Sequence, residues 1–200
     1  MKLMIASDIH GSAYFCRQMI EAYKRERADK LLLLGDILYH GPRNDLPREY
    51  DPKAVAAMLN EMKDEILCVR GNCDTDVDQM VLEFPILAEY AIFYMNSRMI
   101  FATHGHVFHK EKLPMLKPGD ILLNGHFHVP AFEEVGEYFY MNPGSVSIPK
   151  EDSAHSYMIA EDDIYVWKNM EGKSYSTVSI EDIAVGEVNY GQNAGITEND

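Results

Sequence analysis

The sequence predicts an α/β protein, a four-layer α/β/β/α sandwich in which two packed mixed β-sheets lie between outer helices. Two observations support this fold class. The first half alternates short apolar runs with helical patterns, which is typical of a mostly parallel sheet covered by helices. The second half contains strand-like segments that follow one another through short turns, which is typical of antiparallel pairing.

In the first half, three buried strands alternate with two helices. The apolar runs KLMIAS, KLLLLG and ILCVRG predict strands over residues 2–7, 30–35 and 66–71. The segments between them predict helices over residues 14–27 and 52–63. A loop rich in Gly, Pro, Asn and Asp follows the second strand, so the chain is expected to open there into a surface loop.

In the second half, six strand-like segments are separated by short turns. The last three are expected to be consecutive antiparallel strands with hairpin connections. In chain order, the six predicted segments cover residues 89–95, 98–104, 120–126, 132–144, 156–170 and 174–180. Residues 1–183 are predicted to form one domain, and residues 184–200 are predicted to be a flexible acidic tail because they are polar and poor in aliphatic side chains.

The composition is that of a soluble globular protein with a strong excess of acidic residues. The 200 residues include 32 acidic and 18 basic side chains, for a formal net charge of −14. Such a field repels long polyanions, so binding of extended nucleic acid is not expected. No apolar run is long enough to span a membrane, and no cleavable signal is evident, which favours a cytoplasmic protein. Three cysteines in that setting favour free thiols over disulfides.

Five short clusters of potential ligands occur where a predicted strand gives way to a loop. Strand ends in α/β proteins are where ligands usually bind. The glycines before three of these ligands fit tight turns and close approach of the backbone to a substrate. The clusters are SDIHG with Asp8 and His10, GDILYHG with Asp36, RGNCD with Asn72, THGH with His104, and GHFH with His126 and His128.

These residue types are suited to a pair of divalent metal ions. Asp36 is the candidate bridging ligand, because a carboxylate carries two anionic oxygens that two cations can share. Two divalent ions with Asp8, Asp36 and a bridging hydroxide would leave a net charge of about +1, which attracts a phosphodiester anion. Oxygen and nitrogen ligands without thiolate favour Mn²⁺, with Fe, Zn, Ni or Co as alternatives, and four imidazoles argue against a site for magnesium alone.

Each histidine taken alone also has a structural explanation, because isolated histidines are often simply hydrogen-bonded. His109 and His155 have no accompanying motif and are expected to be surface or structural residues. His40 lies in the loop after Asp36, where it could contact substrate. The metal hypothesis therefore depends on the combination and order of the clusters.

The series of clusters resembles the calcineurin-like metallophosphoesterase family, from residue 1 to about residue 180. More narrowly, SDIHGS, GDILYHGPRN, VRGNCD, THGH and NPGSVSIPK are similar to the small bacterial YfcE-type phosphodiesterases. The resemblance implies the metallophosphoesterase fold and two metal ions that share Asp36. It assigns Asp8, His10 and His128 to one ion, and Asn72, His104 and His126 to the other. It also implies in-line attack by a metal-bridging hydroxide.

One position departs from the wider family, in which a histidine that protonates the leaving group often follows the asparagine. Here Cys73 follows Asn72. The thiol could act as a different acid, or Cys73 could be only a small residue tolerated beside the ligand. Asp74 could orient the group or the water that donates the proton.

Three further side chains are candidates for the substrate pocket. Arg43 and Asn44 lie on the loop after Asp36, where arginine could bind phosphate in a bidentate manner. A loop-anchoring salt bridge is the alternative role for Arg43. His106, two residues after His104, could line the pocket without binding metal.

The sequence therefore predicts a metal-dependent phosphodiesterase that hydrolyses a small phosphodiester. It is expected to prefer phosphodiesters, or activated leaving groups, over ordinary alkyl phosphomonoesters. A phosphomonoesterase or nuclease at the same site is one alternative. A non-catalytic protein-binding scaffold, like the metallophosphoesterase-like subunit of retromer, is another. No membrane partner is expected, and the aromatic and aliphatic strands of the second half could form an interface in a homo-oligomer.

Overall fold

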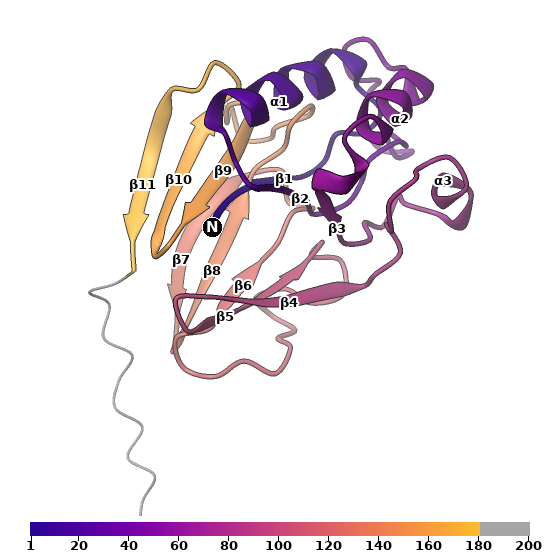
Figure 1. Ribbon diagram of the computed structural model, residues 1–200. Helices are drawn as coiled ribbons and strands as arrows, with labels where there is room; N and C mark the ends of the chain where they lie inside the picture. Colours follow the sequence, from indigo (N-terminus) through magenta and orange to yellow (C-terminus); the bar gives the residue numbers. More distant parts are fainter. Residues whose placement is uncertain (181–200) are drawn as a thin grey trace, which may run out of the picture.

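The computed structural model describes residues 1–180 as two β-sheets packed face to face, with helices on one outer face (Figure 1). The first sheet has six strands and the second has five. In spatial order, the first consists of β11 (Ser174–Ser179), β10 (Ile164–Asn169), β9 (Ser156–Glu161), β1 (Lys2–Ala6), β2 (Lys30–Leu33) and β3 (Ile66–Cys68). The second consists of β4 (Tyr90–Met95), β5 (Arg98–Thr103), β6 (Ile121–Leu123), β8 (Tyr138–Pro143) and β7 (Pro130–Val135).

Both sheets are mixed, as predicted. In the first, β1, β2 and β3 are parallel, whereas β9 pairs antiparallel with β1 and continues into the antiparallel strands β10 and β11. In the second, β5, β6 and β8 are parallel, and β4 and β7 pair antiparallel at the two edges. The predicted fold class, two packed mixed sheets of an α/β sandwich, is confirmed.

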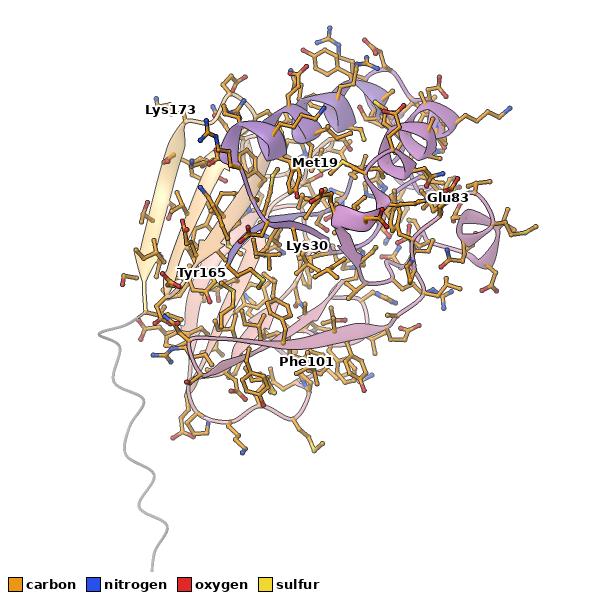
Figure 2. All side chains as sticks on the ribbon, in the orientation of Figure 1. Met19, Lys30, Glu83, Phe101, Tyr165 and Lys173 are labelled. Atoms are coloured by element: carbon orange, nitrogen blue, oxygen red, sulfur yellow. The ribbon has the colours of Figure 1, made fainter. Side chains whose placement is uncertain are left out.

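Helices α1 (Ala13–Glu26) and α2 (Pro52–Asn60) cover the outer face of the first sheet (Figure 1). The hydroxyl of Ser12 caps α1 by accepting the N–H of Phe15 at 3.3 Å, and Asp51 caps α2 in the same way. The apolar side of α1 is buried, and Met19 lies between this helix and the sheet (Figure 2). Capping and burial thus fix the helix that follows the first candidate ligands.

The main core lies between the two sheets. Leu3 and Ile5 of β1 pack there with Tyr165 and Trp167 of β10, and Tyr165 is labelled in Figure 2. Trp167 is 1% exposed, and its indole N–H donates to the carbonyl of Asn142 at 2.7 Å, which ties the two sheets together. Burial of each such large apolar side chain stabilises the fold by roughly 1.5–3 kcal/mol.

The outer face of the second sheet is covered by loop residues within the described part of the chain. Phe101, Leu122 and Tyr140 of this face pack against Phe108 and Leu116, which belong to the segment between β5 and β6 (Figure 2 shows Phe101 on this side). The predicted outer helix is therefore replaced by a loop on this side. That segment lacks a helical apolar pattern and contains prolines at positions 114 and 118.

Several predicted elements end earlier than expected. The predicted strand 66–71 stops at Cys68, and the predicted helix 52–63 stops at Asn60, followed by a 3₁₀ turn at Lys63–Glu65. A short helix, α3 (Asp76–Gln79), follows β3. The strands end early because their last predicted residues turn into the loops that carry the candidate ligands.

The last predicted strands do not form one continuous antiparallel array. Segment 132–144 contains the hairpin β7–β8 of the second sheet, whereas segments 156–170 and 174–180 form β9, β10 and β11 of the first. The loop between β8 and β9 therefore crosses from one sheet to the other. The predicted tail, residues 184–200, lies outside the described residues. No helix within residues 1–180 has the length and apolarity needed to cross a membrane.

Candidate metal centre

The seven candidate ligands lie together although they are spread over 121 positions of the chain, from Asp8 to His128. Each follows a strand directly. Asp8 and His10 follow β1, Asp36 follows β2, Asn72 follows β3, His104 follows β5, and His126 and His128 follow β6. These strands are parallel within each sheet, so their carboxyl ends meet at one edge of the sandwich.

Asp8, His10 and His128 form one compact group. The Oδ1 atom of Asp8 lies 3.3 Å from Nε2 of His128 and 3.6 Å from Nε2 of His10. The two Nε2 atoms are 3.4 Å apart. Oδ1 of Asp8 is buried and has no hydrogen-bond partner, which is costly for a charged oxygen. A cation among these three side chains would remove that cost.

Asn72, His104 and His126 form a second group beside the first. Oδ1 of Asn72 lies 3.1 Å from Nε2 of His104, which is 3.2 Å from Nδ1 of His126. Oδ2 of Asp36 is 3.4 Å from Nε2 of His104 and 3.6 Å from Nε2 of His10. Asp36 therefore lies between the two groups, in the grouping that the family resemblance implies.

Backbone carbonyls fix the orientation of three of the imidazoles. Nδ1 of His10 donates to Tyr39 O at 2.8 Å, and Nδ1 of His128 donates to Ile148 O at 2.7 Å. His104 makes the same contact with a backbone carbonyl at 2.6 Å. A proton on Nδ1 leaves the Nε2 lone pair free, and Nε2 faces the cluster in all three residues. This is how the backbone usually orients histidines that bind metal.

Buried carboxylates and imidazoles in the cluster shift one another's pKa. Burial alone would raise the pKa of Asp8, but the adjacent imidazoles of His10 and His128 hold it well below its usual value. Burial alone would lower the pKa of His104, but the hydrogen bond and charge of Asp36 raise it to about 9. The buried carboxylates thus demand positive charge, which imidazolium or a divalent cation can supply.

The backbone of the centre is held in an unusual conformation. Left-handed φ angles are uncommon for residues other than glycine and cost free energy. Five of the seven candidate ligands have such angles: Asp8, His10, Asp36, His126 and His128, with φ between 48° and 64°. Strained backbone concentrated on one cluster is typical of a functional site.

Glycines allow the ligand loops to approach each other closely. A Cβ atom on Gly71 would overlap the backbone and carboxylate of Asp36, and one on Gly35 would overlap the backbone of Gly71. A Cβ atom on Gly125 would overlap Ser7 and lie 3.1 Å from Oδ2 of Asp8. The predicted close approach at these glycines is therefore between ligand loops.

Asp74 lies beneath the centre and does not face the cavity, which corrects the expectation that it orients a proton donor. Its carboxylate accepts the backbone N–H groups of Gly71 at 2.7 Å, Asp36 at 2.8 Å and Ile37 at 2.9 Å. The side chain is 1% exposed. Asp74 thus joins two ligand loops through three backbone N–H groups.

A cavity of about 440 Å³ opens beside the cluster. Arg43, Asn44 and Cys73 all line it, as the sequence predicts for pocket residues. Cys73 is 8% exposed, its N–H donates to Oδ1 of Asp36 at 2.8 Å, and its thiol joins His10 and Asp36 in a further group of potential ligands. Arg43 makes no ion pair with a carboxylate in residues 1–180, so the alternative of a loop-anchoring salt bridge has no support there.

His106 is displaced from the position expected for it. Its ring lies 5.5 Å from that of His104 and 6.4 Å from that of His126, but it does not line the cavity beside the cluster. Burial lowers the pKa of His106. His40 does not line the cavity either. Its backbone carbonyl accepts a hydrogen bond from the side-chain amide of Asn44 at 2.8 Å.

Phe127 and Lys150 also line the cavity, although the sequence did not predict them as site residues. Phe127 is 41% exposed and lies between two candidate ligands, and Lys150 belongs to the loop that follows β8. A signal existed for both, because Phe127 is the variable position of GHFH and Lys150 ends the segment NPGSVSIPK. Neither motif indicates by itself that these side chains reach the same cavity.

The fold and the site define a class of protein: the chain belongs to the calcineurin-like phosphoesterase superfamily, whose domain model matches residues 1–163. Membership implies binding of divalent metal, and the clustered oxygen and nitrogen donors fit that requirement.

The comparisons with particular proteins point the same way. The chain is 48% identical to phosphodiesterase YfcE of Escherichia coli over 164 residues, which cover 82% of this chain and 89% of that protein. The structure of the Escherichia coli phosphoesterase Yfce superposes with a TM-score of 0.87 at 44% identity, covering 90% of this chain and all of that one.

More distant relatives share the fold. The chain is 26% identical to phosphodiesterase MJ0936 of Methanocaldococcus jannaschii over 153 residues, or 72% of this chain and 83% of that one. Vps29 of Entamoeba histolytica, solved in complex with zinc, has a TM-score of 0.58 at 19% identity and covers 90% of this chain and 99% of that one. At that identity, Vps29 shows the fold alone.

Proposed function

We propose that this protein hydrolyses small phosphodiesters with two divalent metal ions. Asp8, His10 and His128 hold one ion, and Asn72, His104 and His126 hold the other. The name of the relative YfcE, a phosphodiesterase 48% identical over most of its length, supports this reaction class. The acidic chain, with a net charge of −14, favours a small substrate over an extended nucleic acid.

The observation that carries the proposal is the position of Asp36. One carboxylate oxygen, Oδ2, lies 3.4 Å and 3.6 Å from imidazoles of the two ligand groups, and the other accepts the N–H of Cys73 at 2.8 Å. The second contact fixes the carboxylate plane while Oδ2 remains available to both groups. A shared, immobilised carboxylate is the geometry that two adjacent cations need.

The chain's own residues provide binding and orientation. Divalent ions held here would lower the pKa of bound water from about 15.7 to about 7, supplying a nucleophile near neutral pH. Arg43 lines the cavity, where its guanidinium can pair with a non-bridging phosphate oxygen. Cys73 lies on the same wall, at the position proposed for protonation of the leaving group.

Mn²⁺ is the proposed metal. The combination of four imidazoles, two carboxylates and one amide oxygen is borderline in character, so it also accommodates Fe, Zn, Ni or Co. A cytoplasmic location is also proposed. The three cysteines are free thiols in the described structure, which fits a reducing compartment.

Hydrolysis of bis(p-nitrophenyl) phosphate by the Mn²⁺-loaded protein tests the proposal. Asp36→Asn keeps the size of the side chain and an oxygen that can accept the N–H of Cys73, but it removes the charge. We expect this variant to lose at least a hundredfold in kcat/KM. Asp64→Asn, at an exposed aspartate outside the cavity, is the matched control and should retain full activity. Equal activity of Asp36→Asn and the parent protein would refute the metal-dependent reaction.

A non-catalytic scaffold is the second candidate, because the fold of Vps29 is shared. The clustering of all seven candidate ligands argues against it. Absence of turnover with Mn²⁺, Ni²⁺ or Co²⁺, for both diester and monoester substrates, would favour the scaffold. Turnover of p-nitrophenyl phosphate in preference to the diester would instead favour a phosphomonoesterase at the same centre.

A further inference from the structure

Two cations without acidic partners face the cavity beside the candidate metal centre. Arg43 and Lys150 both line this cavity, and neither forms an ion pair with a carboxylate in residues 1–180. Eleven of the 18 basic side chains form no such ion pair, so the distinguishing feature of Arg43 and Lys150 is that both line one cavity. Their placement points to an anionic ligand in the cavity.

A backbone hydrogen bond joins Lys150 to a candidate metal ligand. The backbone N–H of Lys150 donates to the carbonyl of His128 at 3.1 Å. The imidazole of His128 donates in turn to Ile148 O at 2.7 Å, and the hydroxyl of Ser153 donates to Lys150 O at 2.6 Å. These three contacts wrap the loop around His128. The wall that carries the Lys150 side chain is therefore fixed relative to the centre.

Phe127 separates this cavity from a second one. It lines both the cavity of about 440 Å³ and a neighbouring cavity of about 380 Å³. The two also adjoin at consecutive residues, since Lys150 lines the first and Glu151 the second. A ring that is 41% exposed between two cavities offers an apolar face to a ligand that extends across both.

The second cavity combines apolar side chains with an excess of acidic ones, since Glu111, Glu133 and Glu151 also line it. Val129, Ala131 and Tyr140 line it together with Phe127. Nζ of Lys110 donates to both carboxylate oxygens of Glu133, at 2.8 and 2.9 Å, and lies 4.8 Å from the centre of the Tyr140 ring. Unlike Lys150, this lysine is already paired. The second cavity thus fits an organic substituent better than a second phosphate.

We propose that Lys150 and Phe127 form a substrate-recognition wall for the phosphodiesterase reaction, on which this inference rests. Lys150 binds a non-bridging oxygen of the phosphodiester beside the candidate metal ligands. Phe127 packs against the ester substituent that is retained on phosphorus, and that substituent extends into the second cavity. The substrate class is a phosphodiester with at least one bulky, ring-bearing ester group.

Two chromogenic esters with the same leaving group test both contacts. Benzyl p-nitrophenyl phosphate carries a ring on its retained substituent, and methyl p-nitrophenyl phosphate does not. With Mn²⁺-loaded parent protein, we expect kcat/KM to be about fivefold to tenfold higher for the benzyl ester, mainly through KM. Equal values for the two esters would overturn the proposed role of Phe127 and of the second cavity.

Substitutions separate the two contacts. Phe127→Ala should reduce the preference for the benzyl ester to less than twofold, and Phe127→Tyr should keep it. Ala131→Phe, on β7 and away from the candidate ligands, should reduce the same preference by filling the second cavity. This variant keeps the test valid if Phe127→Ala disturbs the neighbouring histidines. Retention of the full preference in Ala131→Phe would contradict the inference.

Lys150 should act equally on both esters. Lys150→Gln should raise KM about tenfold for each ester and leave their ratio unchanged, and Lys150→Arg should restore most of the affinity. Lys173→Gln, at an exposed lysine on the β10–β11 turn (Figure 2), is the charge-matched control and should behave like the parent protein. An unchanged KM in Lys150→Gln would overturn its role. Turnover of neither ester by the parent protein would instead refute the proposed function itself.

Discussion

The Nε2 atoms of His10 and His128 lie 3.4 Å apart, although 118 residues separate the two histidines in the chain. Each imidazole is oriented by a backbone carbonyl at its other nitrogen, and both point to the buried Oδ1 atom of Asp8. Two nitrogen atoms at this distance cannot both carry a proton without repulsion. A divalent cation resolves the conflict because it replaces protons with one shared positive charge.

Binding of Mn²⁺ should therefore stabilise the fold. At a concentration one hundred times its Kd, an ion that binds only the folded state adds about 2.7 kcal/mol to the free energy of unfolding. For a chain of this size that corresponds to an increase of about 5–10 °C in Tm. Differential scanning fluorimetry of EDTA-treated protein with and without Mn²⁺ measures it. His128→Ala should lose most of this gain, whereas His109→Ala, at a half-buried histidine outside the centre, should keep it. The same gain in both variants would contradict the assignment of His128.

Asp74→Asn should weaken both the fold and the reaction. The amide can accept fewer of the three backbone N–H groups that the carboxylate binds, so at least one buried donor is left unsatisfied. We expect a loss of about 1–3 kcal/mol in the free energy of unfolding, measured by urea denaturation. The kcat should fall too, because the backbone of Asp36 moves. Asp76→Asn, at an exposed aspartate two positions further, is the control, and equal stability of the two variants would count against this role of Asp74.

Cys73→His should increase phosphomonoesterase activity. The thiol lies on the cavity wall beside Asp36, where an imidazole could protonate a poor leaving group. Monoester leaving groups of high pKa benefit most, so kcat/KM for an alkyl phosphate should rise about tenfold relative to that for an aryl diester. Cys73→Ser separates size from acidity and should not produce the gain. If Cys73→His shows no gain in phosphomonoesterase activity at any pH between 5 and 9, the side chain at position 73 does not protonate the leaving group.

Glu26 should stabilise the fold in a pH-dependent manner. Burial raises the pKa of Glu26, but hydrogen bonds from Lys168 and Tyr157 lower it below its usual value. A lowered pKa means that the stabilisation is complete above the unfolded-state pKa, about 4.3, and is lost as the pH falls through the folded-state value. We expect Glu26→Gln to be less stable than the parent protein by about 1–2 kcal/mol at pH 7.

The difference between Glu26→Gln and the parent protein should decrease below pH 4. Urea denaturation at pH 7, 5 and 3.5 measures this trend, with Glu61→Gln at an exposed position as the control. A difference that does not change with pH would show that the carboxylate charge is not the cause.

The sequence was sufficient for the fold class because local patterns carry it. Apolar runs alternate with helical patterns up to β3, and each candidate ligand follows a run directly. The pairing of β1 with β9 could not be predicted in the same way, because no local sequence pattern indicates that Leu3 lies opposite Ala160. The crossing of the chain from one sheet to the other between β8 and β9 was not predicted for the same reason.

The candidate ligands were predictable, but their surroundings were not. Spacing and residue type identify Asp36 and His128, whereas the left-handed backbone at these positions results from tertiary contacts. Asp74 was expected beside the reaction because it is close to Asn72 in sequence, but three backbone N–H groups turn its carboxylate away from the cavity. Lys150 was missed because it reaches the cavity only through the fold of the loop around His128.

The most direct test of the two-metal centre is a titration of metal-free protein with Mn²⁺, followed by hydrolysis of bis(p-nitrophenyl) phosphate. We expect the rate to rise to a plateau at two equivalents of Mn²⁺ per chain, and Asp36→Asn to show no such rise. A plateau at one equivalent, or a rate that is independent of added metal, would contradict the two-metal centre.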